Sequence, residues 1–252
     1  MERLKILGAW IDVLTLGEAE ERVAAMVREG RPRQVVTLNP EILYRANREP
    51  ALLDLINRAS LVTADGVGIV WAARLAGKSV PERVTGIDLF LRLAARAAKE
   101  GWRVFLLGGA PGVAEEAAAA LCRKHPGLVI AGTYHGYFPL ESSKKGFESP
   151  GEPDVVEMIR RARPHLLFVG MGAPRQEEFI ARNLKNLDVP VAMGVGGSFD
   201  VLAGRVKRPP VWMQRLHLEW LGRLLREPRR WRRMLVLPRF AWLAWREGIR
   251  GR

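Results

Sequence analysis

Two aspartates in this 252-residue sequence follow segments where a carboxylate is well placed to do chemistry. Asp65 comes directly after the apolar run 61–64, and Asp200 after the glycine-rich segment 194–199. A carboxylate at the end of a buried strand is partly removed from water, which raises its pKa and makes it usable as a general base. The Asp200 carboxylate is suited to accept hydrogen bonds from the ribose or the nucleobase of a nucleotide. Capping of the following helix is the alternative for both residues.

Polar or glycine-rich segments follow five of the apolar runs. They are Thr37-Leu38-Asn39-Pro40-Glu41, Asp65-Gly66, Gly108-Gly109, Gly170-Met171-Gly172 and Gly194–Gly197. Glycine lets a ligand approach the backbone closely, and successive N–H groups hold phosphate oxygens. Asn39 is expected to be the N-cap and Pro40 the first residue of a helix, whose dipole adds to this field. Tight turns alone also favour glycine, but five such segments favour a nucleotide or a phosphorylated ligand.

Several other chemistries are excluded because their motifs are missing. The dinucleotide pattern G-x-G-x-x-G is absent, and Gly77-Lys78-Ser79 has Ala72 where a P-loop has its first glycine. The four histidines are scattered, and no two aspartates are spaced D-x-D. We therefore expect no metal site, no cofactor and a metal-independent reaction. The single cysteine, Cys122, excludes an intrachain disulfide and suits a reducing compartment.

Strands and helices alternate along most of the chain. Short apolar runs predict six strands, at 34–38, 60–64, 103–107, 128–131, 165–169 and 189–193. Helical spacing is found at 40–49, 67–75, 87–100, 112–124, 154–162 and 174–184. This alternation predicts an α/β fold, with a Rossmann-like and mainly parallel sheet that carries helices on both faces. In such a sheet, ligands bind outside the carboxyl ends of the strands, where the polar and glycine-rich segments are expected.

The charge distribution divides the chain near residue 204. The formal net charge is +13, from 40 Lys and Arg against 27 Asp and Glu. Residues 205–252 hold 14 of those bases and three of those acids, a net of +11, together with five of the eight tryptophans. We therefore expect a near-neutral catalytic body over 1–204 and a basic, tryptophan-rich helical tail over 205–252. The polar segment 141–152 is expected to be an exposed loop.

The tail has the pattern of an amphipathic helix at a membrane surface. Between Trp212 and Arg226 the apolar residues, Trp220 among them, share one helical face. Such a helix suits the headgroup region of an anionic bilayer, where each Lys or Arg contributes about 1 kcal/mol. The segment 231–247 continues the pattern, with an expected kink at Pro238. Packing of the apolar face on the body is the alternative.

The sequence shows no stretch with the length and apolar character of a transmembrane helix. The first apolar stretch, Leu4–Leu16, lacks the features of a secretory signal. We therefore expect a cytoplasmic protein that is peripheral on the inner face of the cell membrane.

A series of motifs resembles the WecG/TagA/CpsF glycosyltransferases, known as glycosyltransferase family 26. The series consists of Thr37-Leu38-Asn39-Pro40-Glu41, Ala64-Asp65-Gly66-Val67-Gly68, Arg83-Val84-Thr85-Gly86-Ile87-Asp88, Leu106-Leu107-Gly108-Gly109, Gly170-Met171-Gly172-Ala173-Pro174-Arg175-Gln176-Glu177 and Gly194-Val195-Gly196-Gly197-Ser198-Phe199-Asp200. The ending, with Glu219-Trp220 and Glu227-Pro228-Arg229-Arg230, is also similar. The resemblance covers almost the whole chain, and the segment 141–152 is its main departure, on the acceptor side.

The resemblance implies an inverting hexosyltransferase. It implies transfer of N-acetylmannosamine from its UDP-sugar to the 4-hydroxyl of N-acetylglucosamine on undecaprenyl diphosphate. The product belongs to the linkage unit of wall teichoic acid or a related cell-surface polysaccharide. The alternative is the same reaction with the uronic acid, or another hexose, for common antigen or capsule. The implied partners are this donor, this lipid acceptor and an anionic membrane surface, with no nucleic acid; a homo-oligomer is left open.

The family pattern also implies roles for individual residues. Asp65 is the base that deprotonates the acceptor hydroxyl, and Thr37, Asn39 and Gln176 line the catalytic pocket. The UDP-sugar is assigned to Gly108, Gly109, Tyr137, Gly196, Gly197 and Asp200. The lipid diphosphate is assigned to Arg83, Arg223, Arg230 and Arg233, because a planar guanidinium suits diphosphate oxygens.

Two other classes of protein stay open from the sequence. A nucleic-acid-binding protein fits the net charge of +13, although no recognised nucleic-acid motif is present. A nucleotide-dependent oxidoreductase fits a Rossmann-like sheet, but the missing dinucleotide pattern disfavours it.

Overall fold

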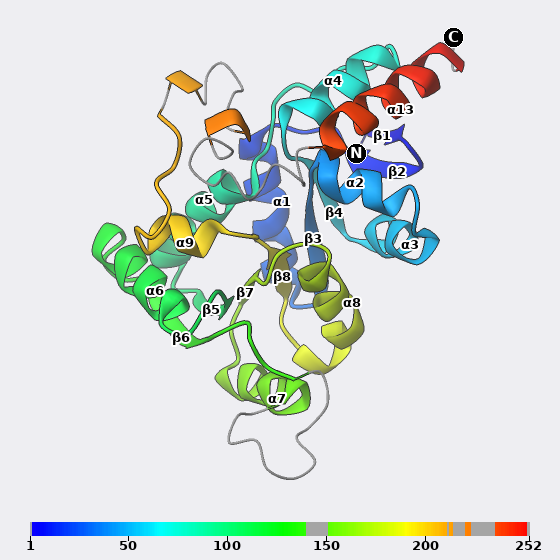
Figure 1. Ribbon diagram of the computed structural model, residues 1–252. Helices are drawn as coiled ribbons and strands as arrows, with labels where there is room; N and C mark the ends of the chain where they lie inside the picture. The colour runs from blue at the N-terminus through cyan, green and yellow to red at the C-terminus, as the bar shows by residue number, and fades with distance from the viewer. Residues whose placement is uncertain (1, 140–150, 211, 214–219, 223–234, 251–252) are drawn as a thin grey trace. The chain divides into compact units, whose positions relative to one another are not determined.

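The computed structural model describes residues 2–139, 151–210, 212–213, 220–222 and 235–250 (Figure 1). Its backbone divides into two compact units. Unit 1 comprises Met1–Leu16, Thr37–Thr85 and Lys207–Arg252, and unit 2 comprises Gly17–Val36 and Gly86–Val206. The sequence-based division into a body and a tail at residue 204 stays a prediction.

Six strands form one sheet, in the order β4-β3-β8-β7-β5-β6. They are β3 (Arg33–Leu38), β4 (Leu61–Ala64), β5 (Arg103–Gly108), β6 (Val129–Tyr134), β7 (Leu166–Gly170) and β8 (Val191–Gly194). The pairs β3–β8, β8–β7, β7–β5 and β5–β6 are parallel. All six predicted strands and the predicted α/β class are therefore confirmed.

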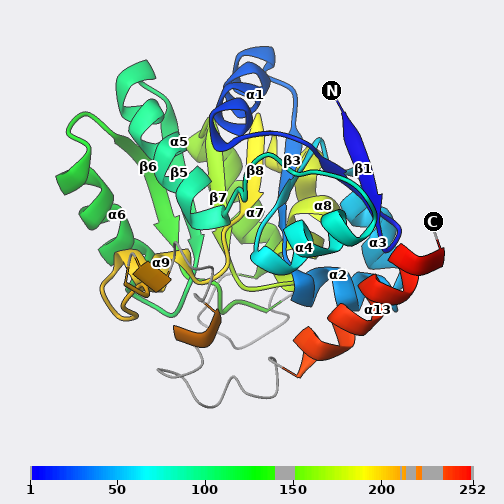
Figure 2. The ribbon, with the colours of Figure 1, turned by 90° about the horizontal axis from the view of Figure 1, so that it is seen from above.

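The helices of unit 2 pack around these strands. They are α1 (Leu16–Glu29), α5 (Gly86–Glu100), α6 (Val113–Lys124), α7 (Glu152–Ala162), α8 (Arg175–Leu187) and α9 (Ser198–Leu202). The four helices predicted between residues 87 and 184 are confirmed, while α1 and α9 were not predicted. Figure 2 shows α1 beside α5, where Arg96 of α5 pairs with Glu21 of α1 at 2.6 Å.

Both faces of the sheet in unit 2 are covered, as β7 demonstrates. Because strand residues alternate between faces, Leu167 and Val169 point to one side and Phe168 to the other. Leu167 and Val169 join a buried cluster with Phe179 of α8 and residues of α7. Phe168 instead meets Phe90 of α5, with ring centroids 4.3 Å apart. Two-sided burial explains why this strand is a continuous apolar run.

Unit 1 contains an antiparallel hairpin and four described helices of its own. The hairpin consists of β1 (Arg3–Ile6) and β2 (Ala9–Asp12). The helices are α2 (Pro40–Ala46), α3 (Pro50–Arg58), α4 (Val67–Leu75) and α13 (Val236–Arg250). Asp12 links the hairpin to β4, because its Oδ2 accepts the Val62 N–H at 2.8 Å. The hairpin and α3 were not predicted, and the helix predicted over 40–49 ends at Ala46.

The end of the tail is a helix that packs on the rest of unit 1. Phe240 and Ala244, one turn apart on α13, are buried, and α13 lies against α2 and α4 (Figure 1). Pro238 falls in the first turn of α13, where a proline costs no helical hydrogen bond. The residues before 235 lie outside the described part of the chain, so the kink expected in the segment 231–247 stays a prediction. Most of the amphipathic segment 212–226 lies outside the described residues. No helix of the described chain has the length and hydropathy needed to cross a membrane.

Candidate active site

The segment after β4 lies beside the segment after β3. The Asp65 N–H donates to the Leu38 carbonyl at 2.9 Å, and the Asp65 side chain is half-buried. Asn39 is the N-cap of α2: its Oδ1 accepts the Ile42 N–H at 3.0 Å, and Pro40 is the first helical residue. Both expectations for this helix start are confirmed. Asp65 and the start of α2 are thus fixed next to each other.

Two glycines bring the start of α4 against α2. Gly66 has a φ of +97° and is the N-cap of α4, so the capping position falls on Gly66 rather than on Asp65. A Cβ on Gly68 would lie only 2.6 Å from Cγ of Pro40. This close packing holds the backbone of the Asp65 segment in place.

Arg83 is brought to the same end of β4. The Val84 N–H donates to the Ala64 carbonyl at 3.1 Å, and Thr63 Oγ1 donates to the Val84 carbonyl at 3.3 Å. Arg83 itself is half-buried. Unit 1 therefore gathers four of the predicted residues, Thr37, Asn39, Asp65 and Arg83, at the ends of two neighbouring strands. A carboxylate in this place can accept a proton, and a guanidinium can bind anionic oxygens.

In unit 2, the loops after β5, β6 and β7 contact one another through their backbones. The Gly109 N–H donates to the Gly170 carbonyl at 3.0 Å, and the Gly136 N–H donates to the Gly109 carbonyl at 2.9 Å. Tyr137 follows Gly136 and is 68% exposed. Asp200 is half-buried in the first turn of α9, just after Gly196 and Gly197.

The glycines of these loops are of two kinds. Gly108 and Gly109 are needed for packing. A Cβ on Gly108 would lie 2.5 Å from the Gly170 backbone, and a Cβ on Gly109 would lie 2.7 Å from Val113 Cβ. Gly172 and Gly196 also have positive φ, yet a Cβ at either would meet no atom within 4 Å. Close packing thus accounts for Gly108 and Gly109, while Gly172 and Gly196, which also have positive φ, have open space beside them.

This contrast gives a stability prediction. Gly109 and Gly172 have nearly the same φ, +71° and +75°, so alanine at either costs similar backbone strain. Gly109→Ala also forces a methyl into Val113, an overpacking cost of about 1–3 kcal/mol. We expect Gly109→Ala to lower the melting temperature by roughly 2–12 °C more than Gly172→Ala, measured by calorimetry. Equal melting temperatures would contradict the packing role.

Gln176 is buried and uses both ends of its amide within unit 2. Its Oε1 accepts the Gly196 N–H at 3.0 Å, and its Nε2 donates to Glu177 Oε1 at 2.8 Å. Gln176 and Glu177 are 3% and 1% exposed. Glu177 was not singled out from the sequence, because an acidic residue in the first turn of a helix is normally solvated.

Arg223, Arg230 and Arg233, assigned to the lipid diphosphate, are outside the described residues. No group of three or more His, Cys, Asp or Glu side chains in the described ranges is arranged to hold a metal ion.

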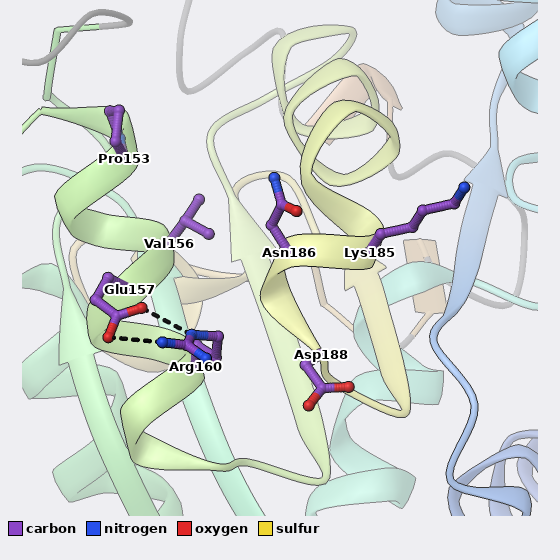
Figure 3. Close-up of a pocket in the computed structure, with 7 residues that line it drawn as sticks. All are labelled: Pro153, Val156, Glu157, Arg160, Lys185, Asn186 and Asp188. Atoms are coloured by element: carbon purple, nitrogen blue, oxygen red, sulfur yellow. Dashed lines mark hydrogen bonds and ion pairs between the residues drawn. The ribbon is translucent and has the colours of Figure 1, made fainter.

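A hollow of about 420 Å³ lies on unit 2, away from the predicted residues. It is lined by Pro153, Val156, Glu157, Arg160, Lys185, Asn186 and Asp188, most of them from α7 and α8 (Figure 3). Hydrogen bonds from Arg160 and Arg161 lower the pKa of the Glu157 carboxyl to about 2. The hollow contains no predicted site residue, and its acidic group at Glu157 is already engaged by neighbouring arginines.

A mainly parallel sheet flanked by helices is the architecture of a Rossmann-like α/β protein. The chain belongs to the glycosyl transferase WecG/TagA/CpsF family, whose model matches residues 4–252. The predicted resemblance is confirmed, and so is the prediction of an enzyme.

Three relatives carry the same name, N-acetylglucosaminyldiphosphoundecaprenol N-acetyl-beta-D-mannosaminyltransferase. The protein of Bacillus spizizenii is 38% identical over 206 residues, 82% of this chain and 76% of its own. That of Bacillus subtilis is 34% identical over 235 residues, 93% of this chain and 84% of its own. That of Staphylococcus aureus is 35% identical over 240 residues, 94% of this chain and 90% of its own. Neither a nucleic-acid-binding protein nor an oxidoreductase is among them.

Proposed function

We propose that this chain transfers N-acetylmannosamine from UDP-N-acetylmannosamine to the 4-hydroxyl of N-acetylglucosamine on undecaprenyl diphosphate, with inversion and without a metal ion. The observation that carries the proposal is the match to the Staphylococcus aureus relative, which is named for this transfer and aligns with 94% of the chain. The grouping of Asp65, Asn39 and Arg83 in unit 1 supports it, because such a transfer needs a base beside the acceptor and cations for its diphosphate.

In the proposed step, the Asp65 carboxylate accepts the proton of the acceptor hydroxyl. The hydroxyl oxygen bonds to the anomeric carbon of the donor sugar while the bond from that carbon to the UDP oxygen breaks. UDP leaves with the electron pair. Arginine side chains stabilise the charge that develops on its diphosphate. Inversion follows because the acceptor attacks the face opposite to UDP.

The experiment is UDP release with a short-chain prenyl-diphosphate-N-acetylglucosamine as acceptor. UDP-N-acetylmannosamine, its uronic acid and UDP-N-acetylglucosamine are compared as donors, each with and without EDTA. We expect acceptor-dependent turnover with UDP-N-acetylmannosamine that EDTA leaves unchanged. Turnover only with the uronic acid form of the donor would show that UDP-N-acetylmannosamine is not the donor. Loss of turnover in EDTA would overturn the proposal that the step needs no metal ion.

We also propose that α13 brings the enzyme to an anionic membrane surface. Trp242 and Trp245 are 55% and 53% exposed, although their helix is anchored to unit 1 by Phe240. The Arg246 guanidinium lies 5.4 Å from the Trp242 ring. Exposed tryptophans beside cations suit the headgroup region, where the ring is buried and the charge meets lipid phosphate. Packing of α13 on unit 1 and membrane binding are therefore compatible.

Binding to vesicles tests this role of α13. The double variant Trp242→Ser, Trp245→Ser is expected to bind phosphatidylglycerol vesicles at least tenfold more weakly in a sedimentation assay, because it loses two large apolar side chains. Trp10→Ser is the matched control, since Trp10 is 41% exposed on the hairpin of the same unit. Equal binding by all three proteins would remove α13 from the membrane contact.

A further inference from the structure

Three side chains form a buried polar cluster where α8 begins next to β3 and β8. Gln34, Gln176 and Glu177 are 4%, 3% and 1% exposed. Gln34 Nε2 donates to the Glu177 backbone carbonyl at 3.1 Å, and Gln176 Nε2 donates to Glu177 Oε1 at 2.8 Å. Gln176 Oε1 in turn accepts the Gly196 N–H at 3.0 Å. The cluster thus ends on the backbone of the loop after β8.

The cluster fills the space over Gly194, the last residue of β8. A Cβ built there would lie 2.5 Å from Gln176 Nε2 and 3.0 Å from Glu177 Oε1. A side chain at this position would have to displace one of these two residues. Glycine at 194 is therefore explained by the cluster rather than by a turn, and its two side chains have little freedom to move.

The surroundings of the Glu177 carboxyl favour its neutral form. Its Oε2 is buried and has no hydrogen-bond partner in the described part of the chain. The cluster around it consists of the Gln34 and Gln176 amides and the Gly194 backbone, while Glu178 of α8 adds a like charge. The nearby cation of Arg175 donates to the Phe138 carbonyl at 3.3 Å. Burial raises the pKa of Glu177 to about 7, although the hydrogen bond from Gln176 acts in the opposite direction.

We infer that Glu177, with a neutral carboxyl, is a positioning residue that holds Gln176 and, through it, the backbone of Gly196. The inference rests on the proposed function in one respect, the assignment of the Gly196 loop to UDP. The carbonyl oxygen of the neutral acid accepts from Gln176 Nε2, which turns the amide oxygen of Gln176 toward Gly196. Ionisation places an uncompensated charge in the cluster, and hydrating that charge requires the cluster to open.

The first test follows the Gly196 amide itself and needs no ligand. Hydrogen exchange of Gly196, corrected for intrinsic exchange, is measured at about pH 6 and about pH 8.5. The wild type should lose about tenfold in protection at the higher pH, the factor expected for one buried hydrogen bond. Glu177→Gln, which is neutral at every pH, should keep its protection, and Glu177→Ala should be poorly protected at both. Glu178→Gln, an exposed neighbour, should show the wild-type pattern with its loss of protection moved to lower pH, because the like charge beside Glu177 is removed.

The second test measures the affinity for UDP over the same pH range by calorimetry. Each protein is compared with Glu177→Gln at the same pH, so that the titration of UDP itself cancels. The wild type should weaken about tenfold relative to Glu177→Gln as the pH rises through 7, and Glu177→Ala should be weak throughout. The folding stability should also depend on pH. The pKa of the Glu177 carboxyl is about 4.5 in the unfolded chain and about 7 in the folded chain, so the folded chain keeps a proton that the unfolded chain releases between these pH values. The stability of the wild type relative to Glu177→Gln should therefore fall as the pH rises from about 4.5 to about 7.

The two tests separate the inference from the proposed function. Identical Gly196 protection in the wild type and Glu177→Gln at both pH values, or equal loss in Glu177→Gln and Glu177→Ala, would overturn the positioning role. If Gly196 protection follows the expected pattern but no protein binds UDP, the positioning role holds and the assignment of the loop to UDP is wrong.

Discussion

Asp65→Asn is expected to lower the rate of sugar transfer by about 10²–10⁴-fold, the contribution typical of a general base. The amide keeps the size of the carboxylate but does not accept a proton from the acceptor hydroxyl. Since the Asp65 backbone is held by the Leu38 carbonyl, the variant should keep its fold and its affinity for UDP. Initial rates of UDP release, at saturating donor and acceptor, measure the effect.

The matched control is Asp54→Asn on α3 of the same unit. Asp54 is exposed and pairs with Arg58 at 2.6 Å, so its loss removes one surface ion pair of little energetic value. The control should transfer sugar at the wild-type rate. If Asp65→Asn retains transfer within a few-fold of that control, the base is another residue.

Phe240→Ala is expected to lower the stability of unit 1 by about 3–5 kcal/mol, because it removes a ring that is only 2% exposed. For a chain of this size the melting temperature should fall by roughly 6–20 °C. The ring lies close to α4, since a Cβ built on Gly68 would be 3.5 Å from it. Differential scanning calorimetry, with vesicles absent, measures the change.

Trp242→Ala is the companion variant, on the same helix but with a ring that is 55% exposed. It should change the stability by no more than about 0.5 kcal/mol, as is usual at the surface. Equal shifts for the two variants would show that α13 does not pack on unit 1 through Phe240. Because α13 packs on the rest of unit 1, removing the tail would disturb both the stability of unit 1 and its membrane binding. Point variants of α13 separate these two effects.

The sequence predicted the six-stranded sheet well for a physical reason. Two-sided burial makes each strand a continuous apolar run, as in Leu166–Val169, and such runs stand out between helical segments. The hairpin β1–β2 escaped prediction because its short strands include exposed positions and are not continuous apolar runs, and because its turn places Leu7 at a φ of +47°. Leucine is not a residue that signals such a turn.

The helix start beside Asp65 was predictable from the sequence, but the contacts of Gln176 were not. Asn39 and Pro40 are residue types typical of a helix start, so their places as N-cap and first helical residue could be predicted from the local sequence. The hydrogen bonds of Gln176 to Gly196 and Glu177 depend on how α8 packs against β8. This packing cannot be predicted from a local sequence pattern. For the same reason, the Cβ environments that separate Gly109 from Gly172 emerged only from the structure.

The most direct test of the proposed function is the mass of the lipid acceptor after incubation with UDP-N-acetylmannosamine and the wild-type protein. Each acceptor molecule is expected to gain one N-acetylhexosamine, with one UDP released for each gain. An unchanged acceptor, with UDP-N-acetylmannosamine either intact or hydrolysed to the free sugar, would contradict it.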